Sequence, residues 1–169
     1  MHSALIWPRY IEYLFGEDLA RFPDEKFPTI QSLCKAVIEH FSAKNLRLCQ
    51  EGRKISTAGK ARPLEAQYQD EFYRAFSSIV PGIPLSSEWS RTGNGRIDFW
   101  IKGKNWGIEL LRDHKRVEDH CSRFKKGGQY YPWVEEDMLK EWIIIDCATS
   151  PAGMCSHCVF LFLISLTSS

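Results

Sequence analysis

The chain lacks the features that would assign it at once to a membrane or strongly charged class of protein. Its net charge at pH 7 is only +1, so the molecule as a whole is no polybasic nucleic-acid binder. The apolar run CVFLFLISL near the C-terminus has nine residues, far short of the roughly 20 that span a bilayer. That run suits either a buried strand or a poorly fitting terminus. We therefore expect no membrane among the partners of this protein.

Cysteine is sparse, and its six copies are scattered without the dense framework of a small secreted domain. The N-terminus has no basic segment followed by an apolar one, as a signal peptide would have. These two absences predict an intracellular protein, of the cytoplasm or the nucleus. Cys147, Cys155, His157 and Cys158 invite a zinc interpretation, but their spacing fits no standard zinc motif and no CxxC pair completes it.

What the chain does have is an ordinary globular composition with an uneven distribution of charge. Its 169 residues, 44% hydrophobic and 25% charged, suggest one domain with room for a small appendage. Residues 91–126 contain ten Lys or Arg and five Asp or Glu, whereas residues 127–146 contain one Lys and five Asp or Glu. The first segment therefore forms either a basic face that attracts polyanions or a solvated face of mixed charge.

The hydrophobic pattern divides the chain into an N-terminal helical element and a larger α/β domain. Residues 1–62 are expected to form two helices and a linker, with the second helix beginning near Pro28 and Thr29. Residues 63–169 form the main domain, whose core is residues 64–147. The core elements are a helix at 64–79, strands at 83–90, 96–101 and 106–111, a helix at 113–125, a short helix from Pro132, and a strand at 141–147 typical of a sheet centre. This α-β-β-β-α-(α)-β order predicts a small α/β fold with a mixed sheet.

Two acidic residues, Asp98 and Glu109, lie inside segments that otherwise have the pattern of buried strands. A hairpin with Gly103 and Lys104 at its tip would place the two carboxylates in direct cross-strand register, with Cβ atoms roughly 4.5–5.5 Å apart. The apolar residues would pair on the other face, namely Ile97 with Leu110, Phe99 with Ile108 and Ile101 with Trp106.

Two opposed carboxylates destabilise a sheet unless a cation lies between them. Carboxylate oxygens suit Mg²⁺ or Mn²⁺, so we expect a metal site at Asp98 and Glu109. Arg96, Trp100 and Leu111 would share this face and partly enclose it. The alternative is a pair of surface acids on a half-exposed sheet.

These residues resemble the PD-(D/E)XK, or restriction-endonuclease-like, nucleases, which present an Asp and a Glu-x-Lys on two strands of an αβββαβ core. Asp98 matches the Asp and Glu109 the Glu, and the acid that this family carries on its first helix would be Glu71, with Glu65 as the competitor. The strings PLEAQYQDEFYRAF, SEWSRTGNGRIDFWI and WGIELLRDHKRVEDHCSRFKKGGQYYPW resemble more narrowly the endonuclease-like domain of fungal Crinkler-type proteins. The resemblance covers residues 64–147.

The resemblance implies a metal-dependent nuclease that acts on nucleic-acid phosphodiesters, with Mg²⁺ or Mn²⁺ as cofactor. We favour DNA over RNA as the partner, and the sequence leaves that choice open. Crinkler-type proteins are effectors, so it also implies delivery into a host cell and an NTPase domain as a partner. The 169 residues contain no P-loop GxxxxGK[ST], so this partner would be either a further domain or a protein in trans, and the chain a fragment, a truncated paralogue or a free-standing module. Oligomeric state is left open.

One departure from the family pattern bears on catalysis. The Lys of Glu-x-Lys falls at Leu111, which cannot activate water. We expect Arg96, opposite position 111 in the predicted register, to supply the missing positive charge, with Arg112 as the other candidate. The rival hypothesis is an inactive effector or interaction module that keeps the nuclease fold.

The helix after the third strand is basic, so it would contact phosphates, the main source of affinity for nucleic acid. Its candidate contacts are Lys115, Arg116, His120, Arg123, Lys125 and Lys126. Tyr130, in the run GGQYYPW, would stack on a base or pack in the core. The alternative for the helix is an exposed amphipathic surface whose acids balance its bases.

Overall fold

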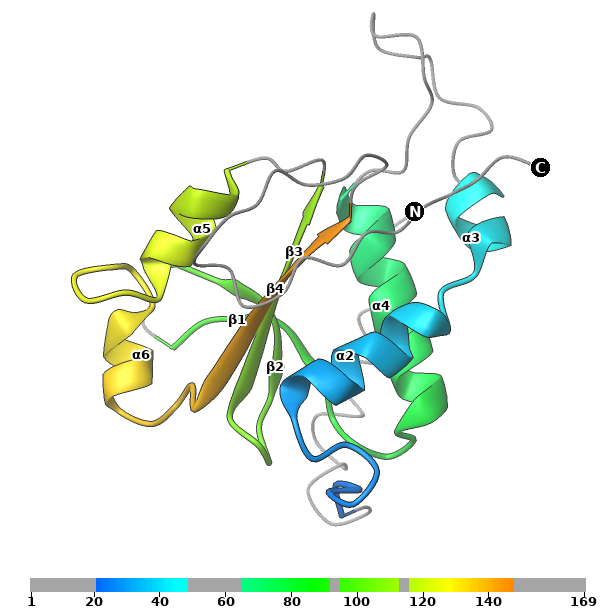
Figure 1. Ribbon diagram of the computed structural model, residues 1–169, viewed down its shortest axis with the longest axis horizontal. Helices are drawn as coiled ribbons and strands as arrows, with labels where there is room; N and C mark the ends of the chain where they lie inside the picture. The colour runs from blue at the N-terminus through cyan, green and yellow to red at the C-terminus, as the bar shows by residue number, and fades with distance from the viewer. Residues whose placement is uncertain (1–20, 49–64, 92–94, 113–115, 148–169) are drawn as a thin grey trace, which may run out of the picture.

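The computed structural model describes residues 21–48, 65–91, 95–112 and 116–147 (Figure 1). Their elements, in chain order, are α2 (Ile30–Glu39), α3 (Ala43–Leu48), α4 (Glu65–Ile79), β1 (Ser86–Trp89), β2 (Ile97–Ile101), β3 (Trp106–Arg112), α5 (Val117–Arg123), α6 (Tyr131–Glu135) and β4 (Glu141–Cys147). From α4 onward this is the predicted order of helices and strands. The predicted first helix, Lys115 and the apolar C-terminal run lie outside the described residues.

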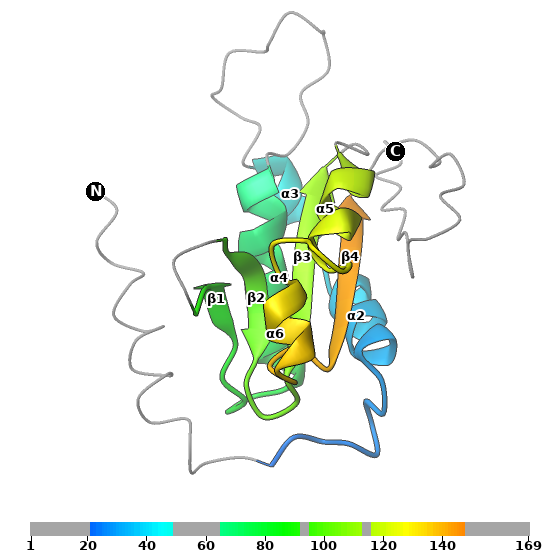
Figure 2. The same ribbon diagram turned by 90° about the vertical axis from the view of Figure 1, so that its left-hand side faces the viewer.

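The four strands form one mixed sheet in the order β1-β2-β3-β4. Strand β2 is antiparallel to both β1 and β3, whereas β3 and β4 are parallel. Helices α2 and α4 cover one face of the sheet, and α5 and α6 cover the other (Figures 1 and 2). The predicted α/β class with a mixed sheet is confirmed. Among the described residues, no helix combines the length and apolar character needed to cross a membrane.

Each face of the sheet buries its own hydrophobic cluster. The α2–α4 cluster contains Phe99, Ile108 and Leu110 from the strands, together with the inner faces of α2 and α4. The α5–α6 cluster contains Trp100 and Leu111, packed against the inner faces of α5 and α6. Because successive strand residues point to opposite faces, these two sets alternate along β2 and β3.

Strand β4 corrects one prediction. Its continuous apolar run predicted the centre of the sheet, yet β4 is the last strand in the described part of the chain. Ile143 and Ile145 are buried in the α2–α4 cluster, and Ile144 is buried in the α5–α6 cluster. A continuous apolar run therefore indicates that both faces of a strand are buried. Helices packed on the two faces can bury a strand in this way even at the end of the sheet.

The described part of the N-terminal element belongs to the same core as the sheet. Helix α2 begins as predicted, because the Thr29 hydroxyl caps it by accepting a hydrogen bond from the Ser32 N–H, and the Thr29 N–H donates one to the Ser32 hydroxyl in return. Leu33 and Val37 of α2 are then buried in the α2–α4 cluster. The predicted boundary at residues 62–63 lies outside the described residues, but α2 is integrated into the main core.

The predicted hairpin register holds at three positions and then fails. Phe99 pairs with Ile108, Trp100 with Gly107 and Ile101 with Trp106. The predicted pairing of Ile97 with Leu110 on one face is wrong, because Ile97 belongs to the α5–α6 cluster and Leu110 to the α2–α4 cluster. The regular ladder therefore ends beside Asp98.

Candidate functional site

Asp98 lies where the β2–β3 ladder ends. Its Oδ2 accepts a hydrogen bond of 2.7 Å from the backbone N–H of Leu110, a group that belongs to the neighbouring strand. The Asp98 side chain thus occupies the Leu110 N–H, which a backbone carbonyl of β2 would accept from in a regular ladder. The regular pairing, followed from the turn, therefore ends at Phe99. Asp98 is half-buried at this opening between two strands.

Helix α4 approaches Asp98 from the side of the α2–α4 cluster. The side-chain amide of Gln69 donates a hydrogen bond to Asp98, and the charge of Glu65 acts on it. Burial, then the negative charge of Glu109, raises the pKa of Asp98 from 3.8 to about 7, although the Leu110 and Gln69 hydrogen bonds oppose the rise. The charges of Asp98 and Glu109 therefore interact, although the direct pairing that the register predicted for these two residues is not among the observed β2–β3 pairs.

Glu109 is buried and is held from the opposite face by helix α5. Its Oε2 lies 2.6 Å from His120 Nδ1 and 3.6 Å from Arg123 Nη1. Its Oε1 is buried and has no hydrogen-bond partner among the described residues. A buried carboxylate oxygen without a partner is costly, so this atom is free to accept a ligand, while the Tyr130 hydroxyl also interacts with Glu109.

The two carboxylates therefore do not share one face as predicted. Asp98 is contacted from α4, whereas Glu109 is contacted from α5, which lies on the other side of the sheet. The physical reason is the interrupted ladder, which releases Asp98 from strict alternation.

Tyr130 completes the α5 side of the site and takes the core-packing alternative of the two that the sequence left open. Its hydroxyl donates to the backbone carbonyl of Arg96 at 2.5 Å and accepts from Arg123 Nη1 at 3.3 Å. Burial and the charge of Glu109 raise the pKa of Tyr130 to about 12. The ring is buried and stacks on Trp133 with 5.0 Å between centroids, so it cannot stack on a base.

Glu71, predicted as the helix-borne acid, serves a different purpose. It is buried, and it accepts hydrogen bonds from the Ser42 N–H, Asn45 and the Arg74 guanidinium. Burial alone would raise the pKa of Glu71, but these hydrogen bonds outweigh it and lower the pKa. Glu71 thus ties α4 to the start of α3, and it is Glu65 that lies near Asp98.

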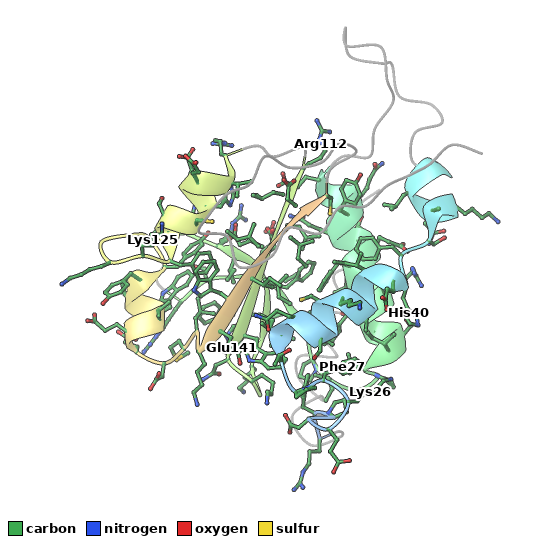
Figure 3. The ribbon with its side chains drawn as sticks, in the orientation of Figure 1. Lys26, Phe27, His40, Arg112, Lys125 and Glu141 are labelled. Carbon is green, nitrogen blue, oxygen red and sulfur yellow. The ribbon has the colours of Figure 1, made fainter. Side chains whose placement is uncertain are left out.

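Arg96 does not occupy the place of the missing Lys. Its Nη1 donates to Glu88 Oε2 at 2.7 Å, and its side chain is 66% exposed. Leu111 is buried in the α5–α6 cluster. Arg112 is half-buried at the end of β3, at the upper edge of the sheet in Figure 3.

The predicted phosphate-binding residues are divided between the site and the surface. His120 and Arg123 turn inward to Glu109, whereas Arg116, Lys125 and Lys126 are exposed. Lys125 projects from the connection between α5 and α6 in Figure 3, well away from Arg112. Two of the residues predicted to form a basic surface, His120 and Arg123, therefore contact the buried Glu109 instead.

Sequence reasoning missed Asp146, a third buried carboxylate. It lies in β4 next to Leu111 in the parallel register, one strand away from Glu109. The signal was visible, since Asp146 is a single acid inside the apolar run WIIIDC, as Asp98 is within IDFWI.

Two features bear on the expected metal. The described residues include no group of three or more His, Cys, Asp or Glu side chains arranged to hold a metal ion. The oxygens of Asp98 and Glu109, by contrast, are of the type that Mg²⁺ and Mn²⁺ prefer.

Comparisons of the chain with family models, curated proteins and solved structures found no match.

Proposed function

We propose that this chain is a restriction-endonuclease-like domain that acts on nucleic-acid phosphodiesters with Mg²⁺ or Mn²⁺ bound at Asp98 and Glu109. One observation carries the proposal: two interacting carboxylates lie at the end of a strand pair, and Oε1 of one of them is buried with no hydrogen-bond partner among the described residues. The order α4-β1-β2-β3-α5-α6-β4 supports it, since the resemblance implies an αβββαβ core.

The donor atoms are of the type that a hard divalent cation prefers, and although α4 contacts Asp98 and α5 contacts Glu109, the two carboxylates interact where the strands open. With a pKa of about 7, Asp98 is partly protonated near neutral pH, so a cation would replace a proton there. A bound cation would also give Glu109 Oε1 the partner that it lacks. When bound, it would lower the pKa of water and stabilise charge on the phosphate in the transition state.

The residues around the carboxylates have separate tasks in this proposal. The Gln69 amide and the Leu110 N–H hold the Asp98 carboxylate at the strand opening. His120 fixes the orientation of Glu109 through Nδ1. Glu65, exposed at the start of α4, adds negative charge that favours a cation.

Cleavage of supercoiled plasmid DNA and of structured RNA with Mg²⁺ or Mn²⁺ tests the proposal. We expect the wild type to nick plasmid, and Asp98→Asn and Glu109→Gln each to lower the rate by 100-fold or more. Glu88→Gln is the matched control, because Glu88 is an exposed carboxylate paired with Arg96. Equal activity of all four proteins would reject the site.

A second measurement separates metal binding from cleavage. Mn²⁺ should raise the melting temperature of the wild type by mass action and leave that of Asp98→Asn/Glu109→Gln unchanged. The same rise in both proteins would mean that the ion binds elsewhere.

A second candidate function is an interaction module that keeps the fold without the chemistry. Leu111 favours it, because a buried apolar side chain stands where the resemblance calls for a Lys. Binding of DNA with no cleavage in either metal would support this candidate.

A further inference from the structure

Arg123 is positioned differently from the other basic residues near the site. It lies on α5 with its side chain 30% exposed, and its Nη1 reaches within 3.6 Å of Glu109 Oε2. Arg96 by comparison is paired with Glu88, and His120 is only 14% exposed. Arg123 thus joins the buried carboxylate to the solvent.

The contact between Arg123 and Glu109 is an electrostatic one that a stronger ligand can replace. Its 3.6 Å separation exceeds the 2.7–3.2 Å typical of an N–H···O hydrogen bond. The guanidinium is held from within by the Tyr130 hydroxyl at 3.3 Å, and its carbon lies 5.8 Å from the centre of the Tyr130 ring. Only Nη1 is used in these polar contacts with described residues, and a guanidinium has five donors.

Charge balance defines the class of ligand that would approach this group. Arg116, Lys125 and Lys126 are exposed at the two ends of α5 and attract anions toward it. The planar guanidinium matches two oxygens of a phosphate diester, which a single ammonium group cannot do as well. A phosphate that draws Arg123 outward would leave Glu109 with less positive charge and hence a greater affinity for a cation.

We propose that Arg123 is the phosphodiester-binding residue of this site, and that it exchanges Glu109 for a backbone phosphate when nucleic acid binds. The inference rests on the proposed function, because it assigns the substrate contact of the same site. It also means that nucleic acid and divalent cation bind cooperatively, each favouring the other.

Two binding measurements on the full chain test this without cleavage. In EDTA, the affinity for a fluorescent 20-base-pair duplex is measured at several salt concentrations for the wild type, Arg123→Ala, Arg123→Lys and Lys140→Ala. We expect Arg123→Ala to bind roughly tenfold more weakly. Its slope of log affinity against log salt should shrink by about 0.9, the effect of one lost phosphate contact. Arg123→Lys should recover the slope, and Lys140→Ala should leave the affinity unchanged, because Lys140 is exposed just before β4.

The second measurement gives a result that a purely structural role would not produce. Without DNA, Arg123→Ala should bind Mn²⁺ at least as tightly as the wild type in calorimetry, because a competing positive charge beside Glu109 is gone. Weaker duplex binding together with retained or tighter Mn²⁺ binding supports the exchange. Loss of both, with a lower melting temperature, would make Arg123 a structural residue and overturn the inference.

The remaining outcomes distinguish this inference from the proposed function. Duplex binding that depends on Arg123, in a protein that cuts nothing, would uphold the inference and reject the nuclease. Cleavage by Arg123→Ala with the kcat and KM of the wild type would uphold the nuclease and reject the inference about Arg123. A wild type that neither binds the duplex nor cuts it would reject both.

Discussion

The strongest quantitative consequence of the site is a stability that depends on the ionisation of Asp98. Its pKa rises from 3.8 to about 7 on folding, so the folded state binds this proton more tightly than the unfolded state does. The stabilisation is therefore complete below about pH 4 and is lost as the pH rises through about 7. A rise of about three pH units at about 1.4 kcal/mol each amounts to about 4 kcal/mol.

Asp98→Asn removes this titration while keeping the shape of the side chain. The amide oxygen of Asn can still accept from the Leu110 N–H, so the end of the ladder is preserved. In EDTA, the variant should match the wild type near pH 4.5 and become progressively more stable than it up to about pH 8. The expected difference at pH 8 is as much as about 4 kcal/mol in the free energy of unfolding.

Urea denaturation of both proteins at intervals from pH 4.5 to 8 measures this difference. Asp137→Asn is the matched control, because Asp137 is exposed and its φ of 57° suits Asn. A difference between Asp98→Asn and the wild type that is flat with pH, or that falls as the pH rises, would refute the assignment of a buried, proton-binding Asp98.

Three further substitutions test the packing around the site. Glu71→Gln should destabilise the fold by about 1–3 kcal/mol, because the buried acid loses its charge-assisted hydrogen bonds with the Arg74 guanidinium, while the stabilisation by Mn²⁺ survives; loss of that response would return Glu71 to the metal site. Gly107→Ala should cost about 1–3 kcal/mol in urea denaturation, because the added Cβ would lie 2.5 Å from Ile97 Cδ1, and an unchanged stability would contradict this packing. Arg96→Ala should change the free energy of unfolding by less than about 1 kcal/mol and leave any plasmid cleavage intact; a sharp fall in turnover would restore the role predicted from sequence.

Local patterns predicted most of the elements. Three short-range patterns correctly predicted local structure. They are the stripe of apolar residues in α4, the turn before Asn105, and the alternation of side chains in β2 and β3. The three observed β2–β3 pairs follow from the turn alone, since one turn sets the register of the whole hairpin. That register also placed Asp98 near Glu109, and their charges interact, but the direct pairing that it predicted for them is not among the observed pairs.

The errors have a common origin in contacts between distant parts of the chain. Arg96 and Arg123 are both basic and both within reach of the site by sequence, yet one pairs with Glu88 on β1 and the other with Glu109 from α5. Glu71 is captured by Ser42 and the residues around it, which lie far away in sequence. No periodic pattern encodes which partner a long side chain reaches.

The sequence by itself determined the helices and strands from α4 onward, the three observed β2–β3 pairs and the two acids beside them, because each depends on neighbours within one element or one turn. The tertiary structure decided where the β2–β3 ladder stops, which helix approaches each carboxylate and which basic residue neutralises Glu109. The reason is that the Asp98 carboxylate can accept a hydrogen bond from the Leu110 N–H only where β2 and β3 are no longer paired through their backbones. The helices packed on the two faces of the sheet determine where that is. Whether the Leu110 N–H bonds to a backbone carbonyl or to the Asp98 side chain therefore depends on contacts throughout the fold.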